Sequence, residues 1–159
     1  MATFSIRPLG ALDLDLASSL HGAAFAPWGE RAWTRLDFGE LLAKPGVMGL
    51  VAEQDGEEMG FALCRLAANE AELLTIAVRA DVRRLGAGRA LLDAMIEHLR
   101  EFGAAALFLE VGVDNQAANS LYRQAGFQVV GRRPGYYARA TGHPAADALI
   151  MRLFLRPAG

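Results

Sequence analysis

Two glycines and three arginines lie close together near the middle of the chain, in a segment whose composition suits phosphate binding. The segment reads Arg83-Arg84-Leu85-Gly86-Ala87-Gly88-Arg89. It stands between a run typical of a strand and the start of the most regular helical pattern in the sequence. Helix N-termini present unpaired N–H groups and a partial positive charge, and glycine lets a phosphate approach the backbone without a Cβ in the way. We therefore predict that residues 83–89 cradle a pyrophosphate.

The segment matches neither of two common nucleotide motifs. It lacks the Gly-x-x-x-x-Gly-Lys-Ser/Thr pattern of nucleotide hydrolases, and it is one glycine short of the Gly-x-Gly-x-x-Gly fingerprint of dinucleotide-binding proteins. The pyrophosphate of another cofactor is therefore the better interpretation. The alternative is that Gly86 and Gly88 only shape a tight turn, with the arginines on a solvated surface.

Hydrophobic periodicity predicts the strands and helices that would position this segment. Strands are expected at residues 4–7, 47–53, 59–66, 71–79, 105–111, 127–132 and 148–155, and helices at residues 11–24, 30–43, 86–102 and 115–125. The order β-α-α-β-β-β-α-β-α-β-β predicts an α/β fold, a mixed sheet with helices packed on its faces. Residues 71–111 would form a right-handed βαβ unit, and such sheets bind ligands at the carboxyl ends of their strands. The glycine segment follows one of these ends.

Composition excludes several classes of protein. A length of 159 residues, with 53% apolar and 21% charged residues, suits one globular domain that covers residues 1–159. A net charge of −2 provides no whole-molecule basic field, so we expect no nucleic acid partner. The longest apolar runs are far shorter than the ~20 residues of a membrane span, and no secretory signal is visible. We therefore expect a cytoplasmic protein with no membrane partner.

Cysteine and histidine usage argues against a disulfide or a metal site. Cys64 is the only cysteine, so no internal disulfide can form, and a buried filler is its expected role. His21, His98 and His143 have no partner at the spacing of metal ligands, so we expect no metal. The sequence does not set the oligomeric state, for which a monomer and a weak dimer both remain open.

Residues on both sides of the glycine segment extend the pattern. Arg83-x-x-Gly86-x-Gly88 resembles the coenzyme A pyrophosphate motif of the GNAT superfamily of N-acetyltransferases, and Glu110-Val111, Asn115 and Leu121-Tyr122 resemble its next motif. The runs that resemble the RimI-type ribosomal-protein-alanine N-acetyltransferases are Glu72-Leu73-Leu74-Thr75-Ile76-Ala77-Val78, Ala118-x-x-Leu121-Tyr122-x-x-x-Gly126-Phe127 and Arg133-Pro134-Gly135-Tyr136-Tyr137. The resemblance spans nearly the whole chain. It implies a GNAT-like, mostly antiparallel sheet of about seven strands flanked by about four helices, with acetyl-CoA as cofactor and an amine as acceptor.

The resemblance also implies a role for individual residues. The cofactor-binding set is Ile76, Ala77, Val78, Arg83, Arg84, Leu85, Gly86, Ala87, Gly88, Arg89, Asn115 and Tyr122. In this assignment the backbone of Ile76 and Val78 pairs with the pantetheine chain like an added strand, and the Val78 N–H polarises the acetyl carbonyl. Asn115 hydrogen-bonds the cofactor arm. Glu110 is the general base for the amine, and Tyr122 protonates the thiolate of the coenzyme A product.

These assignments have structural alternatives. Glu110 stands in an alternating strand pattern and could be only its polar-face residue, in which case Glu72 is the rival base. Tyr122 falls on the apolar stripe of its helix, where an aromatic is more often core than catalyst. The candidates for the acceptor pocket are Trp28, Glu72, Tyr136 and Tyr137. A tyrosine pair in a loop is often only packing.

The resemblance further implies the N-terminal alanine of a ribosomal small-subunit protein as the acceptor. An α-amino group has a pKa of about 7.7–8.0 and lysine one of about 10.4, so an N-terminus loses its proton more readily. Gly112 and Asp114 depart from the RimI-type pattern, which usually carries Arg after Glu-Val and Ser before the Asn. Another protein N-terminus, a lysine or a small-molecule amine therefore remains open. A non-catalytic acyl-CoA-binding module and, last, a mononucleotide-binding protein are further alternatives.

Overall fold

The computed structural model describes residues 3–83 and 85–156, and within them one seven-stranded sheet has the strand order β1-β2-β3-β4-β5-β7-β6. The strands are β1 (Ser5–Pro8), β2 (Val47–Gln54), β3 (Glu57–Ala67), β4 (Glu70–Val78), β5 (Ala106–Gly112), β6 (Gln128–Tyr137) and β7 (Ala146–Phe154). The α-helices are α1 (Leu14–Phe25), α2 (Arg35–Ala43), α3 (Ala87–Glu101) and α4 (Gln116–Gln124), and the 3-10 turns are η1 (Ala11–Asp13), η2 (Ala26–Trp28) and η3 (Ala80–Val82). Neighbouring strands are antiparallel apart from the parallel pair β4 and β5. The expected element order and the mixed, mostly antiparallel sheet are confirmed.

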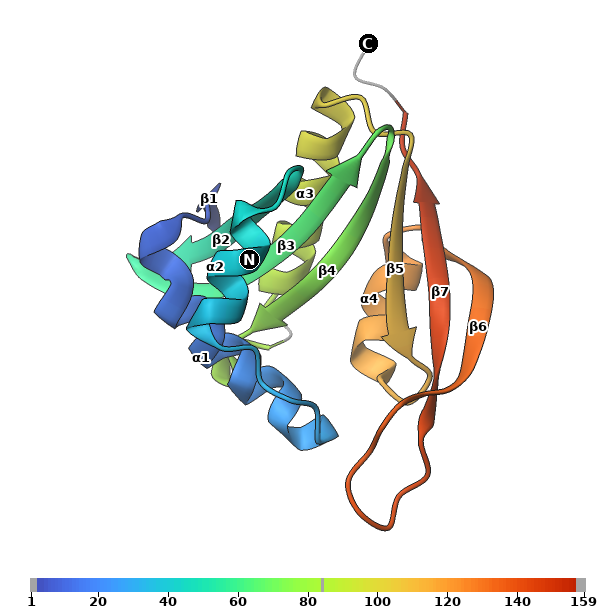
Figure 1. Ribbon diagram of the computed structural model, residues 1–159. Helices are drawn as coiled ribbons and strands as arrows, with labels where there is room; N and C mark the ends of the chain where they lie inside the picture. The colour runs from blue at the N-terminus through green and yellow to red at the C-terminus, as the bar shows by residue number, and fades with distance from the viewer. Residues whose placement is uncertain (1–2, 84, 157–159) are drawn as a thin grey trace.

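Helices cover both faces of the sheet (Figure 1). α3 and α4 pack on one face, where the fully buried Leu91, Leu92, Met95 and Leu99 form the apolar stripe of α3. α1 and α2 pack on the opposite face of β2, β3 and β4, with Phe38 fully buried in a second cluster. Burial of each such side chain stabilises the fold by roughly 1.5–3 kcal/mol, so the two clusters hold the helices on the sheet.

The helix expected at residues 30–43 is shorter than predicted and begins at Arg35. Thr34 and Asp37 form a capping box: the Asp37 N–H donates to Thr34 Oγ1 at 3.1 Å, and the Thr34 N–H donates to Asp37 Oδ2 at 2.8 Å. These bonds satisfy two backbone donors and fix the start of the helix at Arg35. Residues 30–34 are consequently an irregular connection outside the helix, and Glu30 in it belongs to the site described below.

The helix expected at residues 11–24 also begins later, because its first turn is the 3-10 turn η1. The four-residue apolar spacing predicted that Leu12 lies on the buried face of this helix, but Leu12 is fully exposed. The Asp13 carboxylate accepts hydrogen bonds from the Arg7 guanidinium and from the Gly10 N–H, which fixes this turn before α1 starts. The apolar spacing was therefore extended one turn too far.

The strand expected at residues 127–132 is longer than predicted, since β6 continues to Tyr137. Its pairing with β7 resumes at Tyr137 opposite Ala146 after a register shift that follows Arg133. Tyr136 and Tyr137 therefore end a strand, and the expectation that they lie in a loop was wrong. Pro134 and Gly135 obscured this strand in the sequence, because both residues are uncommon inside paired strands.

The parallel strands β4 and β5 diverge after a short paired stretch (Figure 1). Their register ends at Glu72 opposite Phe108, although β4 continues to Val78 and β5 to Gly112. On the other edge of β4, Leu63 pairs with Thr75 and Cys64 with Leu73, so Leu74 is the extra residue of a β-bulge. A bulge bends its strand and increases the local twist. The bulge thus stands where β4 turns away from β5.

Features that would indicate other classes of protein are not found in residues 3–83 and 85–156. No helix there is both long enough and apolar enough to cross a bilayer. No group of three His, Cys, Asp or Glu side chains in this part of the chain is arranged to hold a metal ion. Cys64 is buried in β3, and burial raises the pKa of its thiol to about 12, as expected of a filler.

Candidate active site

The expected cradle lies at the N-terminus of α3. Gly86 is the N-cap residue with a left-handed φ of 98°, which glycine adopts without strain. Arg83 and Leu85 are exposed beside it, and Ala87 is buried under the first turn. Arg89 pairs with Asp93 one turn along α3, with Nε to Oδ1 at 2.9 Å. The N–H groups of the first turn of a helix have no partner within it, and the exposed Arg83 lies three residues before the N-cap. Arg84, predicted to belong to this set, lies outside the described residues.

The free backbone edge of β4 leads into this cradle. The Arg79 N–H donates to Met59 O of β3 at 2.8 Å. Backbone groups alternate sides along a strand, so Ala77 also faces β3 whereas Ile76 and Val78 direct their N–H and C=O groups the other way. On that side the pairing with β5 has already ended. An extended ligand that carries amides could pair with this edge as an added strand.

The edge, the cradle and α4 meet at Gly88. A Cβ at this position would lie 3.7 Å from Val78 Cγ2 and 3.7 Å from Leu121 Cδ2. Leu121 precedes Tyr122 on α4, so the end of β4, the first turn of α3 and the predicted acid occupy one region. The donor edge and the helix N-terminus together fit the amide-bearing arm and the pyrophosphate of coenzyme A.

Glu110 points to the face of β5 opposite the buried Leu109 and Val111. This is the face on which α1 and α2 cover β2 to β4, and Glu110 itself is partly exposed, with 22% of its side-chain surface accessible. Its Oε1 lies 3.2 Å from Nε of Arg133 on β6. The Glu110 carboxylate is therefore accessible and lies next to a cation. The sequence did not predict that Arg133 would lie beside Glu110.

Tyr122 lies in the α3–α4 core, only 5% exposed, with its ring edge-on to Phe127 at 5.7 Å between centroids. Burial raises the pKa of its phenol well above the ordinary value, and the neighbouring Tyr137 raises it further. The phenol stays protonated at neutral pH, as an acid must. The ring is a core residue, and its role as the acid stays a prediction.

Tyr137 interacts electrostatically with both predicted catalytic residues. Burial raises the pKa of its phenol to about 12, and the charges of Glu110 and Glu30 raise it in the same direction. Since Tyr137 also raises the pKa of Tyr122, its ring stands near both the predicted base and the predicted acid. Tyr136 is half exposed, packs edge-on to Tyr137 at 5.0 Å and lies under the Arg133 guanidinium at 5.4 Å.

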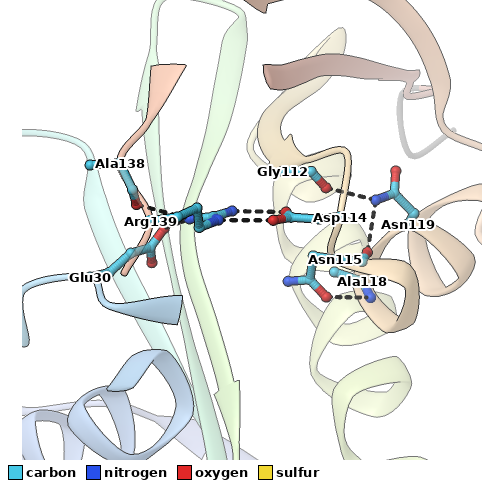
Figure 2. Close-up of polar contacts among 8 residues, drawn as sticks. All are labelled: Glu30, Gly112, Asp114, Asn115, Ala118, Asn119, Ala138 and Arg139. Carbon is cyan, nitrogen blue, oxygen red and sulfur yellow. Dashed lines mark hydrogen bonds and ion pairs between the residues drawn. The ribbon is translucent and has the colours of Figure 1, made fainter. Parts of the chain in front are cut away.

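Asn115 is the N-cap of α4, where its Oδ1 accepts a hydrogen bond from the Ala118 N–H at 3.2 Å (Figure 2). Asn119 supports this turn by donating from Nδ2 to Gly112 O at 2.9 Å and to Asn115 O at 2.7 Å. The acceptor atom of Asn115 is thus occupied by the cap. Its Nδ2, which makes no hydrogen bond to the described residues, is the atom available for the expected bond to a cofactor arm.

Glu72, the rival base, lies at the closed end of the β4–β5 pair. It is exposed, stands opposite Phe108 of β5 and Arg65 of β3, and makes no ion pair with a described residue. Glu110 lies two residues beyond Phe108 toward the diverging end. The geometry therefore favours Glu110 over Glu72 as the carboxylate beside Tyr137.

Sequence reasoning missed an arginine that joins three segments (Figure 2). Arg139 follows β6, and its Nε and Nη2 donate to Asp114 Oδ2 and Oδ1 at 2.9 and 2.8 Å. Its Nη1 lies 3.4 Å from Glu30 Oε1, and its guanidinium lies 5.2 Å from the ring centroids of both Trp28 and Tyr137. The guanidinium holds the pKa of Asp114 below its usual range, whereas burial raises the pKa of Glu30.

The departures at Gly112 and Asp114 were the only sequence signal for this arrangement. A Cβ at residue 112 would lie 2.7 Å from Arg139 Nη2 and 3.6 Å from Tyr137 Cδ2, so glycine makes room for the guanidinium. Asp114 provides its bidentate partner. The predicted acceptor residues Trp28 and Tyr137 are brought together by Arg139, while Tyr136 is at the rim and Glu72 is elsewhere.

Known proteins are similar to this chain in sequence and in fold. Residues 14–127 match the family model described as acetyltransferase (GNAT) family. The chain is 36% identical over 150 residues to the ribosomal protein bS18-alanine N-acetyltransferase of Escherichia coli (strain K12), covering 94% of this chain and 96% of that protein. The protein of the same name from Salmonella typhimurium (strain LT2) is 37% identical over 154 residues, covering 96% and 97%. The crystal structure of the ribosomal-protein-S18-alanine N-acetyltransferase from Escherichia coli has a TM-score of 0.85 and 32% identity, covering 99% of this chain and 97% of that chain.

Proposed function

The chain belongs to the acetyltransferase (GNAT) family, and we propose that it transfers an acetyl group from acetyl-CoA to the α-amino group of an N-terminal alanine on a ribosomal protein. It is an acetyl-CoA-dependent N-acetyltransferase. The alanine acceptor rests on the near full-length similarity to two proteins named for that reaction. We place the reaction in the cytoplasm, where ribosomal proteins are made.

The cofactor is held largely by backbone. The N–H and C=O groups of Ile76 and Val78 bind the amide-bearing arm, and the α3 N-terminus at Gly86 to Gly88 binds the pyrophosphate. Arg83 adds a nearby positive charge, and the Nδ2 of Asn115 donates a further hydrogen bond. Acetyl-CoA, when bound, supplies the acetyl group activated as a thioester.

Glu110 and Tyr122 carry the proton transfers. An α-amino group is roughly a tenth or more neutral at pH 7, so the Glu110 carboxylate has only a modest task in accepting the amine proton, directly or through a water molecule. Tyr122 holds a proton at Oη because burial raises its pKa, and this proton is available to the departing thiolate. The Val78 N–H stabilises the negative charge that develops on the acetyl oxygen.

One observation carries this proposal. A Cβ at Gly112, two residues beyond Glu110, would lie 3.6 Å from Tyr137 Cδ2, Tyr137 in turn raises the pKa of Tyr122, and Leu121, the residue before Tyr122, lies with Val78 around Gly88 of the cradle. A base, an acid and a cofactor-binding edge therefore converge, each contributed by a different element. A non-catalytic acyl-CoA-binding module needs the edge and the cradle but gives no reason for the base and the acid.

A matched pair of peptides tests the acceptor. The first peptide begins with a free alanine and contains no lysine. The second differs in two ways: its N-terminus is acetylated, and one internal residue is replaced by lysine. We expect the purified protein with acetyl-CoA to modify the free alanine with a kcat/KM at least about 100-fold higher, because lysine is far less often neutral. Mass spectrometry locates the acetyl group. A higher kcat/KM for the lysine peptide would contradict the proposed acceptor. A higher kcat/KM for small-molecule amines than for either peptide would contradict it too.

A further inference from the structure

Arg139 is more buried than its position suggests. It lies between β6 and β7, flanked by the exposed Ala138 and Ala140, yet only 9% of its side-chain surface is accessible. A buried guanidinium is costly unless its partners are well placed. Here two carboxylates and two aromatic rings surround it. The fork of Arg139 matches Asp114 in a bidentate pair, which lysine cannot reproduce.

The partners of Arg139 come from separate parts of the chain that meet on the acceptor side. Trp28 and Glu30 precede α2, Asp114 lies in the turn between β5 and α4, and Tyr137 ends β6. A Cβ at Gly112, two residues beyond Glu110 on β5, would lie 3.6 Å from Tyr137 Cδ2, and Tyr137 raises the pKa of Tyr122. Among the described residues, the hydrogen bonds and ion pairs of Arg139 include none to the α3 N-terminus or to the free edge of β4. Arg139 therefore lies on the side of the acceptor residues and makes no hydrogen bond or ion pair to a predicted cofactor-binding residue, although its partner Asp114 directly precedes Asn115.

The charges in this region favour a cationic acceptor. Glu30, Glu110 and Asp114 contribute three carboxylates, and Arg133 and Arg139 contribute two guanidinium groups, which leaves an excess of one negative charge. An incoming α-ammonium group is attracted by such an excess. Without Arg139 the carboxylates of Glu30 and Asp114 would lose their cation, and the rings of Trp28 and Tyr137 would lose the group between them.

We propose that Arg139 is a positioning residue for the acceptor. It fixes Trp28 and Tyr137 as walls of the site that receives the peptide N-terminus, and it holds Glu30 and Asp114 away from that N-terminus so that Glu110 receives it. This inference rests on the proposed function. It adds that acceptor recognition depends on a bridge between three loops, whereas cofactor recognition does not.

The test compares Arg139→Ala and Arg139→Lys with wild-type protein on the peptide that begins with alanine. We expect the KM for the peptide to rise at least about tenfold in Arg139→Ala, and less in Arg139→Lys, which keeps the charge without the fork. The Kd of acetyl-CoA, measured by calorimetry, should stay within about twofold because no cofactor-binding residue contacts Arg139. If Arg139 had only a structural role, the substitutions would lower the melting temperature, and the peptide KM would not rise selectively over the Kd of acetyl-CoA.

Arg132→Ala is the matched control. Arg132 lies on β6, seven residues before Arg139, and its Nε pairs with Asp147 Oδ2 at 2.7 Å, as Arg139 pairs with an aspartate. It has no contact with Glu30, Asp114 or Tyr137 among the hydrogen bonds of the described residues. We expect the peptide KM of this variant to match the wild-type value. An equal rise in Arg132→Ala and Arg139→Ala would overturn the proposal.

Two further variants keep the proposal testable if Arg139→Ala does not fold. Gly112→Ala retains every charge but places a Cβ against Arg139 Nη2, so we expect a smaller rise in peptide KM in the same direction. Asp114→Asn removes one charge of the bidentate pair and should raise the peptide KM above the wild-type value. Unchanged peptide KM in both variants would overturn the proposal. Wild-type protein that does not acetylate the alanine peptide would instead overturn the proposed function.

Discussion

The cofactor side and the acceptor side of this site are built in different ways. The cofactor side consists of backbone: the unpaired edge of β4 at Ile76 and Val78, and the N-terminus of α3 at Gly86. The acceptor side consists of side chains from distant segments, joined by Arg139. A backbone site needs only the right turn and the right strand ending, so it tolerates most substitutions. A side-chain site can change its acceptor through a few residues while the cofactor side stays the same.

Substitution of the reacting groups should have the largest effect. Glu110→Gln removes the proton acceptor and Tyr122→Phe the proton donor, and each should lower kcat by about 10²- to 10⁴-fold while the Kd of acetyl-CoA stays nearly unchanged. Steady-state rates and calorimetry measure the two quantities. The matched controls are Glu72→Gln at the closed end of β4 and β5, and Tyr136→Phe at the rim. Loss of rate in Glu72→Gln with full activity in Glu110→Gln would assign the base to Glu72.

Acid should weaken the packing of α1 against the segment that precedes α2. His21 on α1 is buried, stacks on Trp33 at 4.5 Å and accepts a hydrogen bond from the Trp33 N–H at Nδ1, 3.2 Å away. Burial lowers the pKa of His21 to about 4, so the neutral form is favoured in the folded protein. This stability is complete above about pH 6.5 and is lost as the pH falls toward 4, because the unfolded chain then binds a proton that the folded chain resists.

The loss should reach about 2 kcal/mol of unfolding free energy between pH 6.5 and 4. Urea unfolding across this range measures it in wild-type protein and in His21→Phe, whose carboxylates are the same. The difference between the two curves isolates His21. If both proteins lose stability in parallel over this range, the protonation of His21 is not the cause.

Substitution of Gly86 in the cradle should have a smaller effect, which changes cofactor affinity and leaves the peptide KM unchanged. Gly86→Ala forces an alanine to adopt a φ of 98°, which costs about 1–2 kcal/mol. We expect the Kd of acetyl-CoA to rise about tenfold and the peptide KM to stay unchanged. Gly103→Ala is the matched control, since Gly103 has a φ of 83° just after the other end of α3, in open space. An equal change in cofactor affinity in both variants would show that helix stability, and not the cradle, is responsible.

Strong periodic patterns made most of the fold predictable. The apolar stripe of α3 and the order of strands and helices follow from spacing alone, since each element buries one face. The wrong boundaries have local causes. The cap at Thr34 makes α2 begin later than predicted, and Pro134 and Gly135 obscured the last residues of strand β6. The interpretation of residues 1–159 as one domain stays a prediction.

The two sides of the site differed in how far the sequence revealed them. Gly86 and Gly88 are two positions apart in the chain, close to their arginines, so a local pattern could reveal the cradle. Glu30 and Arg139 are separated by 109 positions and meet only in the folded protein. Gly112 and Asp114 were noticed as departures, but only the structure shows that they make room for Arg139 and bind it. The roles of Glu110 and Tyr122 stay predictions.

Residue-resolved amide hydrogen exchange, with and without coenzyme A, tests the central claim most directly. The free edge of β4 should bind the cofactor, so the amides of Ile76 and Val78 should exchange more slowly when coenzyme A is added. The Ala77 amide, which already faces β3, should not change. This alternation is the predicted result. Equal exchange at Ile76 and Val78 with and without saturating coenzyme A would contradict the account.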